Sequence, residues 1–183
     1  MTTFEEGNNV KLVFQFNEKW TDLLKFDEAE EVQQRSQLGK AVDFIGVLSL
    51  KICYLIEAKH FQEAYLKFDM EKLKGEEPLI TKDIIKKITD SLATISHLAE
   101  QSKVDKPYWQ RINGFTNQQK SCTVLHLEIE GLSPLLTQSI FTITTNILKQ
   151  KLSKQTPNVI VTNSKINVLA PDLVVEIKKS LAK

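Results

Sequence analysis

The chain has 183 residues, of which 42% are hydrophobic and 26% are charged, as in an ordinary globular protein. Its net charge of +1 comes from 24 basic and 23 acidic residues, so a general attraction to polyanions is not expected and nucleic-acid binding would need a local patch. The length predicts a single domain over residues 1–183.

The cysteines and the hydropathy pattern predict a cytoplasmic protein. Cys53 and Cys122 lie in apolar runs without a framework of spaced cysteines, which favours buried, inert thiols in a reducing compartment over a disulfide or a reactive thiol. The first residues lack the basic and apolar regions of a signal peptide. No run approaches the ~20 apolar residues of a membrane span, so we expect no membrane contact.

The first third of the chain predicts a helix followed by two strands. Residues 11–27 are expected to form an amphipathic helix, and the polar residues 28–39 a helix tail and a loop that ends at Gly39. Apolar runs over about 40–49 and 51–60 predict two strands that are covered on both faces. The helical spacing of 11–27 is carried by Val13, Phe16, Trp20, Leu23 and Leu24.

The rest of the chain alternates between predicted helices and strands. Residues 61–78 are expected to form a short helix and a loop, and about 81–102 a long amphipathic helix. A polar loop over 103–119 and a strand over 121–130 follow. Pro134 then suits the first turn of a helix over 134–152, Val159–Val161 predicts a strand, and Pro171 opens a C-terminal helix.

Charged residues interrupt the two apolar strands at positions that bring them together. Asp43 lies in the first strand, and Glu57 and Lys59 lie two residues apart at the end of the second, on one face of it. If the strands pair as a hairpin, Asp43 meets Glu57 across the sheet. Two carboxylates beside an ammonium group can hold a divalent cation through oxygen ligands, with the ammonium close to a metal-bound water.

Asp43, Glu57 and Lys59 resemble the motif of the PD-(D/E)xK nuclease superfamily, which has the restriction-endonuclease-like fold. The family pattern is an acid in one strand and Glu/Asp-x-Lys in the next; here Val42 stands where many members have proline. The resemblance covers about residues 11–130, with 131–183 as a C-terminal extension of the sheet. It implies a three-layer α/β sandwich whose mixed central sheet is flanked by helices, with a parallel crossover from strand 51–60 to strand 121–130.

The resemblance also implies a metal-dependent phosphodiesterase. Asp43 and Glu57, with the backbone carbonyl of Ala58, would hold Mg²⁺ or Mn²⁺, and Lys59 would orient the attacking water. Many relatives add an acid from their first helix. In the matching register Asn17 stands at that place with Glu18 beside it. The third acid is therefore Glu18, a later residue such as Glu31, or absent.

DNA is the expected partner, and a homodimer is one option for its assembly. Basic residues at the start of the long helix and in the loop after it are candidates for phosphate contact, with Tyr108 and Trp109 available for base stacking. We expect the phosphate-contacting residues to be Lys82, Lys86, Arg111 and Lys120. His126 and Glu128 share one strand face, which we interpret as a polar face rather than a second metal site.

Two other interpretations stay open. The chain could be a catalytically inactive domain of the same fold that binds nucleic acid or serves in assembly. Alternatively, it is an unrelated α/β scaffold in which Asp43, Glu57 and Lys59 form an internal ion network.

Overall fold

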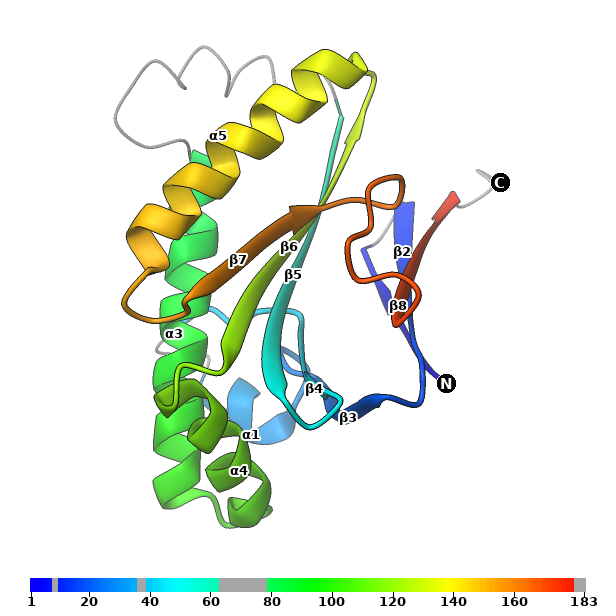
Figure 1. Ribbon diagram of the computed structural model, residues 1–183. Helices are drawn as coiled ribbons and strands as arrows, with labels where there is room; N and C mark the ends of the chain where they lie inside the picture. The colour runs from blue at the N-terminus through cyan, green and yellow to red at the C-terminus, as the bar shows by residue number, and fades with distance from the viewer. Residues whose placement is uncertain (8–9, 36–38, 63–78, 180–183) are drawn as a thin grey trace.

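The computed structural model describes residues 1–7, 10–35, 39–62 and 79–179, arranged as two β-sheets and a layer of helices (Figure 1). The larger sheet has five strands in the order β3-β4-β5-β6-β7. The smaller sheet has three strands in the order β1-β2-β8. The larger sheet is mixed, as expected for the predicted α/β class.

The five-stranded sheet is built from a meander followed by two parallel additions. β3 (Trp20–Lys25), β4 (Phe44–Leu48) and β5 (Ile52–Gln62) pair antiparallel. β6 (Ser121–Glu130) and β7 (Asn158–Thr162) extend the sheet in parallel. The connection from β5 to β6 therefore crosses over the sheet, as the sequence predicts.

Helices cover one face of this sheet. α3 (Leu79–Gln101) and α5 (Pro134–Leu152) lie along that face, and α4 (Lys106–Asn117) and the short α1 (Glu30–Gln33) lie beside β3 and β4 (Figure 1). Side chains from alternate positions of β5, such as Cys53 and Leu55, pack here against Ile88 and Ile95 of α3. The apolar stripe of α3 is thus buried against the sheet.

The other face of the sheet is covered by the three-stranded sheet instead of by helices. It consists of β1 (Thr2–Glu6), β2 (Val10–Phe16) and β8 (Leu173–Lys179), paired antiparallel. The remaining alternate positions of β5, such as Tyr54 and Ile56, pack against Phe14 and Phe16 of β2. Both faces of β5 are therefore buried, which explains its continuous apolar sequence.

The predicted helices over 11–27 and after Pro171 are wrong. Residues 11–27 contain β2 and β3, and the C-terminal segment contains β8. Leu12, Phe14 and Phe16 alternate along β2 and point into the core between the sheets. The spacing that suggested a helix combined residues from two separate strands.

The predicted polar loop over 103–119 is also wrong, because residues 106–117 form α4. The Asp105 side chain caps this helix by accepting a hydrogen bond from the Tyr108 amide, and Pro107 lies in the first turn. Trp109 and Ile112 of α4 are buried in the helical layer. The polar residues that suggested a loop belong to the outer face of an amphipathic helix.

The other predicted elements within the described residues agree with the structure. β4, β5, α3, β6, α5 and β7 lie where the patterns place them, with shifts of a few residues at their ends. Most of the short helix and loop predicted over 61–78 lies outside the described residues. Within the described part of the chain, no helix is both long enough and apolar enough to cross a membrane.

We expect Phe14→Ala to lower the free energy of unfolding by about 3–5 kcal/mol, because it leaves a cavity between the two sheets. Phe14 is 0% exposed, and the centroid of its ring lies 4.8 Å from that of Phe44 across this interface. Denaturant titration followed by circular dichroism measures the change. The control is Val174→Ala in β8, where the side chain is 40% exposed and the expected loss is below about 1 kcal/mol. Equal losses would contradict the assigned packing of the two sheets.

Candidate active site

The hairpin of β4 and β5 brings Asp43 and Glu57 together. Phe44 pairs with Ile56 at the open end of the hairpin, so the next residues outward, Asp43 and Glu57, lie opposite each other. Asp43 is 4% exposed and Glu57 is 0% exposed. Asp43 Oδ2 accepts a 2.6 Å hydrogen bond from the backbone N–H of Ala58. The cross-strand meeting of the two acids is as the sequence predicts.

Two lysines balance the negative charge of these buried carboxylates. Lys59 Nζ lies 2.7 Å from Glu57 Oε1, and Lys87 Nζ of α3 lies 2.7 Å from the same oxygen. Lys87 Nζ also lies 3.5 Å from Asp43 Oδ1. The second oxygen, Glu57 Oε2, is buried and has no hydrogen-bond partner among the described residues.

A second group of acids adjoins Asp43. One carboxylate oxygen each from Glu6, Asp27 and Asp43 lie within 4.8 Å of one another. Glu6 ends β1, and Asp27 lies in the turn after β3, where the Phe26 amide donates a 2.8 Å hydrogen bond to the Asp43 carbonyl. Asp27 Oδ1 is buried and without a hydrogen-bond partner in the described part of the chain. It is therefore free to bind a ligand.

Burial and mutual repulsion shift the pKa values of these acids upward. Burial, with the Glu57 carboxylate adding to it, raises the pKa of Asp43 to about 7. Burial and the nearby Asp43 raise the pKa of Asp27 to about 6. Burial raises the pKa of Glu57 against the pull of Lys87 and Lys59. Burial would lower the pKa of Lys87, but the Asp43 and Glu57 carboxylates outweigh it and raise this pKa.

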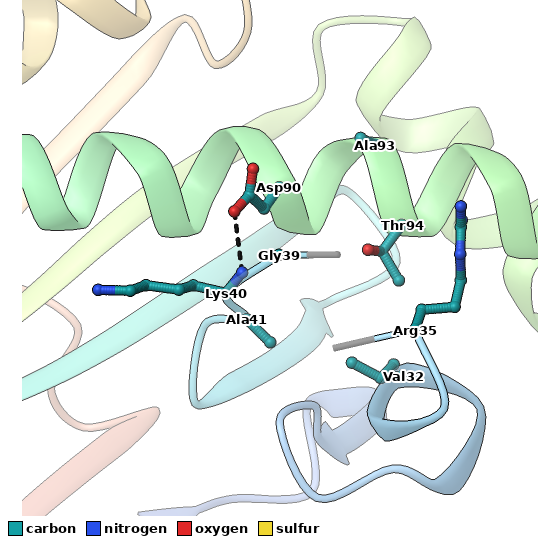
Figure 2. A pocket seen from close by; sticks show the side chains of 8 residues that line it. All are labelled: Val32, Arg35, Gly39, Lys40, Ala41, Asp90, Ala93 and Thr94. Atoms are coloured by element: carbon teal, nitrogen blue, oxygen red, sulfur yellow. Dashed lines mark hydrogen bonds between the residues drawn. The ribbon is translucent and has the colours of Figure 1, made fainter. Parts of the chain in front are cut away.

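Helix α3 also fixes the segment that leads into Asp43. The Lys40 amide donates a 2.8 Å hydrogen bond to Asp90 Oδ2, and the Val42 amide donates one of 3.0 Å to Ser91 Oγ. A Cβ atom on Gly39 would lie 2.9 Å from Asp90 Oδ2, so a larger side chain would push Asp90 aside. Figure 2 shows the hydrogen bond from the Lys40 amide to Asp90 among the residues that line a hollow. This hollow lies between α1, residues 39–41 and α3 and has a volume of about 100 Å³. The position of Asp43 thus depends on α3 as well as on the hairpin.

The acids proposed from the first predicted helix lie elsewhere. Glu18 is exposed in the turn between β2 and β3, near Trp20, whereas Asp43 lies at the Lys25 end of the β3–β4 pair. The Glu31 carboxylate accepts hydrogen bonds from the Trp109 indole at 2.9 Å and from the Ser102 hydroxyl at 3.0 Å. Neither residue belongs to the acidic group around Asp43, and the error follows from reading strands β2 and β3 as a helix.

The candidate phosphate-contacting residues divide into two sets. Lys82 and Lys86 are exposed on the first turns of α3, the part of the helix that also carries Lys87. Arg111 is paired with Asp22 of β3. Lys120 directly precedes β6 at Ser121, which pairs with Cys53 at the start of β5, away from Glu57.

The stacking role expected for the aromatic residues is not supported by their positions. Trp109 is 3% exposed, and the Tyr108 hydroxyl donates a 3.0 Å hydrogen bond to the Asp22 carbonyl. Both rings pack against the helical core rather than projecting into solvent.

His126 and Glu128 form a polar pair on the opposite face of the sheet. Their side chains are 2.9 Å apart, and the His126 ring packs edge-on against Phe14. Among the described residues, the only cluster of three or more potential metal ligands is Glu6, Asp27 and Asp43. Both side chains are buried, with His126 1% and Glu128 6% exposed.

Lys87 is one of the basic residues at the start of the long helix that were expected to contact DNA, and the sequence motif did not point to Asp27 or Glu6. Lys87 could have been found from its place in the apolar stripe of α3, between Ile84 and Ile88, where a lysine needs a buried acidic partner. No local pattern marks Asp27 or Glu6. Comparison of the chain with protein-family models, with curated proteins and with solved structures found no match.

In metal-free buffer we expect the melting temperature of the protein to fall as the pH rises from about 5 to about 8. Folded Asp43 and Asp27 hold protons up to a pH of about 7 and about 6, whereas both aspartates have an ordinary pKa of 3.8. The folded state thus binds more protons than the unfolded state in this range, and its stability declines as they are lost. Thermal denaturation at several pH values measures the slope.

Asp43→Asn is the matched variant for this measurement. It should reduce the slope and be more stable than the wild type at pH 8, because it removes a buried, repelled charge and keeps the shape of the side chain. A wild-type melting temperature that rises over this pH range would contradict the assigned environment.

Proposed function

We propose that this protein is a Mg²⁺-dependent phosphodiesterase of the PD-(D/E)xK type that acts on DNA. The observation that carries the proposal is the meeting of Asp43 and Glu57 across the hairpin, with Lys59 on the same face and Asp27 beside Asp43. The order of elements supports it, since an antiparallel hairpin, a helical crossover and a parallel strand are the arrangement that the family resemblance implies.

The donor atoms around Asp43 fit a divalent cation. They are carboxylate oxygens, the ligands that Mg²⁺ and Mn²⁺ prefer, and they come from separate segments that converge on one place. Asp27 Oδ1 and Glu57 Oε2 are buried without hydrogen-bond partners among the described residues. Buried oxygens of this kind are costly unless a ligand satisfies them. Asp43 and Glu57 would hold the cation, with Asp27 and Glu6 as the additional acids.

The residues have distinct roles in this proposal. The bound cation would acidify water and neutralise charge that develops on the phosphate. Lys59 is 26% exposed, so its ammonium can reach a substrate and orient the attacking water or stabilise the phosphate oxygens. Asp43 holds the Ala58 amide and thereby fixes the backbone between Glu57 and Lys59. The Ala58 carbonyl remains a proposed additional ligand.

Lys82 and Lys86 support DNA as the substrate class. They are exposed on the first turns of α3, the helix whose Lys87 contacts Glu57. A basic strip beside an acidic centre can hold the sugar–phosphate backbone while one phosphodiester enters the site. Arg111 and Lys120 contribute less in this proposal because of their positions. Pairing of two copies stays one option for the assembly.

A second candidate is a catalytically inactive domain of the same type that binds nucleic acid. The observation that favours it is the pairing of Glu57 with two lysines: Oε1 lies 2.7 Å from the ammonium groups of both Lys59 and Lys87. Such an ion network satisfies much of the buried charge without a metal. The unrelated-scaffold interpretation rests on the same contact. Metal binding separates it from the two nuclease-like alternatives.

We expect Mn²⁺ or Mg²⁺ to bind the wild type and to support cleavage of DNA, and Asp43→Asn to lose both. Isothermal titration calorimetry measures binding, and single- and double-stranded DNA are assayed with the same samples. Lys59→Met should keep metal binding and lower kcat by about 10²-fold or more, because it removes a group aimed at the developing charge.

Glu18→Gln is the matched control for these variants, because Glu18 is exposed and remote from the site. Binding without cleavage would favour the inactive-domain alternative. No binding at millimolar metal, even with DNA present, would overturn the metal site.

We expect the double substitution Lys82→Met with Lys86→Met to weaken DNA binding and to reduce the slope of log affinity against log salt by about two units. Each lysine that contacts a phosphate releases about one counterion. Fluorescence anisotropy with a labelled oligonucleotide in Ca²⁺, at several salt concentrations, measures the slope. Lys120→Met is the control and should leave it unchanged. A larger effect at Lys120 would move the DNA path away from α3.

A further inference from the structure

Lys87 differs from the other lysines of the site in its origin and its contacts. It comes from α3, whereas Asp43, Glu57 and Lys59 belong to the hairpin. Its ammonium lies 2.7 Å from Glu57 Oε1 and 3.5 Å from Asp43 Oδ1, so it contacts both of the acids that would hold the proposed metal. Its side chain is 16% exposed.

We propose that Lys87 is a positioning residue that serves as an internal cation: it holds Asp43 and Glu57 together in the metal-free protein and gives up this contact when a divalent cation binds. The inference rests on the proposed metal-dependent function. It assigns Lys87 a role distinct from that of Lys59, which contacts Glu57 from the same strand.

The charges explain why such a residue is needed. Asp43 and Glu57 are buried next to each other, and two carboxylates in this position repel. Asp27 and Glu6 add further negative charge close to Asp43. Without a cation between them, the hairpin and the turn after β3 would be pushed apart. The Lys87 ammonium supplies that cation from the helix that covers the site.

The same charge opposes the metal. A divalent cation bound to the carboxylates would lie within a few ångströms of the Lys87 ammonium, in surroundings where charges interact more strongly than in water. Lysine has a flexible stem of four methylenes, so the ammonium can swing away while its carbon chain stays packed on α3. The released ammonium would then be available to a substrate phosphate beside Lys59.

The test compares Mn²⁺ binding and metal-free stability in Lys87→Met. The variant removes the charge and keeps a side chain of similar length. We expect the melting temperature of the metal-free protein to fall by roughly 5–10 °C, because two buried acids lose a partner. We expect Mn²⁺ to bind at least about tenfold more tightly, because a repelling charge is gone. If Lys87 only maintained the shape of the site, its substitution would lower both the melting temperature and the affinity for Mn²⁺.

Lys149→Met is the matched control, since Lys149 is an exposed lysine in the last turn of α5 and does not belong to the group around Asp43. This control should change neither the melting temperature of the metal-free protein nor its affinity for Mn²⁺ appreciably. Lys87→Arg keeps the charge and should restore most of the metal-free stability of the wild type without the gain in Mn²⁺ affinity. Equal or weaker Mn²⁺ binding by Lys87→Met than by the wild type would overturn the inference.

A measurement on the wild type covers the case in which Lys87→Met does not fold. Lysine acetylation with a short pulse of reagent, followed by mass spectrometry, should label Lys87 slowly without metal and at least several-fold faster with Mn²⁺. Labelling of Lys86 should stay constant. Unchanged labelling of Lys87 in protein that binds Mn²⁺ would overturn the inference and leave the proposed function intact. Absence of Mn²⁺ binding in both the wild type and a folded Lys87→Met would overturn both.

Discussion

The structure depends on the burial of two carboxylates, Asp43 and Glu57, at the open end of one hairpin. The negative charge of these carboxylates needs a cationic partner, and the two cations come from different elements: Lys59 from the hairpin and Lys87 from α3. The hairpin and the crossover helix are therefore tied to each other by charge as well as by apolar packing, and the turn that carries Asp27 is held by the hydrogen bond from the Phe26 amide to the Asp43 carbonyl. The Ala58 amide completes this arrangement by holding Asp43.

The sequence predicted the parts of the fold in which local pattern and final environment agree. The stripe of α3 and the continuous apolar runs of β4, β5 and β6 each match the surface they bury. The second sheet was missed because its strands are specified by partners at a distance. In β2, Val13 and Phe16 fit a helical period when joined to Trp20, whereas Leu12, Phe14 and Phe16 fit a strand. Pairing with β8, at the other end of the chain, decides between them.

The candidate site likewise has a part that the sequence predicted and a part that it did not. Asp43, Glu57 and Lys59 lie in one hairpin, and their convergence follows from the alternation of side chains along paired strands. Asp27 and Glu6 reach the same place through the turn after β3 and the end of β1. Their approach depends on how the two sheets stack, which no local spacing encodes. The mistaken choice of Glu18 shows how an error in one element moves a proposed ligand to the wrong end of a strand.

The pairing of β2 with β8 has a consequence for the order in which the protein forms during synthesis. β4, β5 and the crossover to β6 can assemble as soon as residue 130 is available, but β2 lacks one of its neighbours until residues 173–179 have been made. β1, which carries Glu6, pairs with β2 in the same sheet. Contacts between distant segments form slowly. The hairpin acids and their lysines can therefore meet before β8 has been made, whereas the sheet that contains β1 is completed only after β8 has been made.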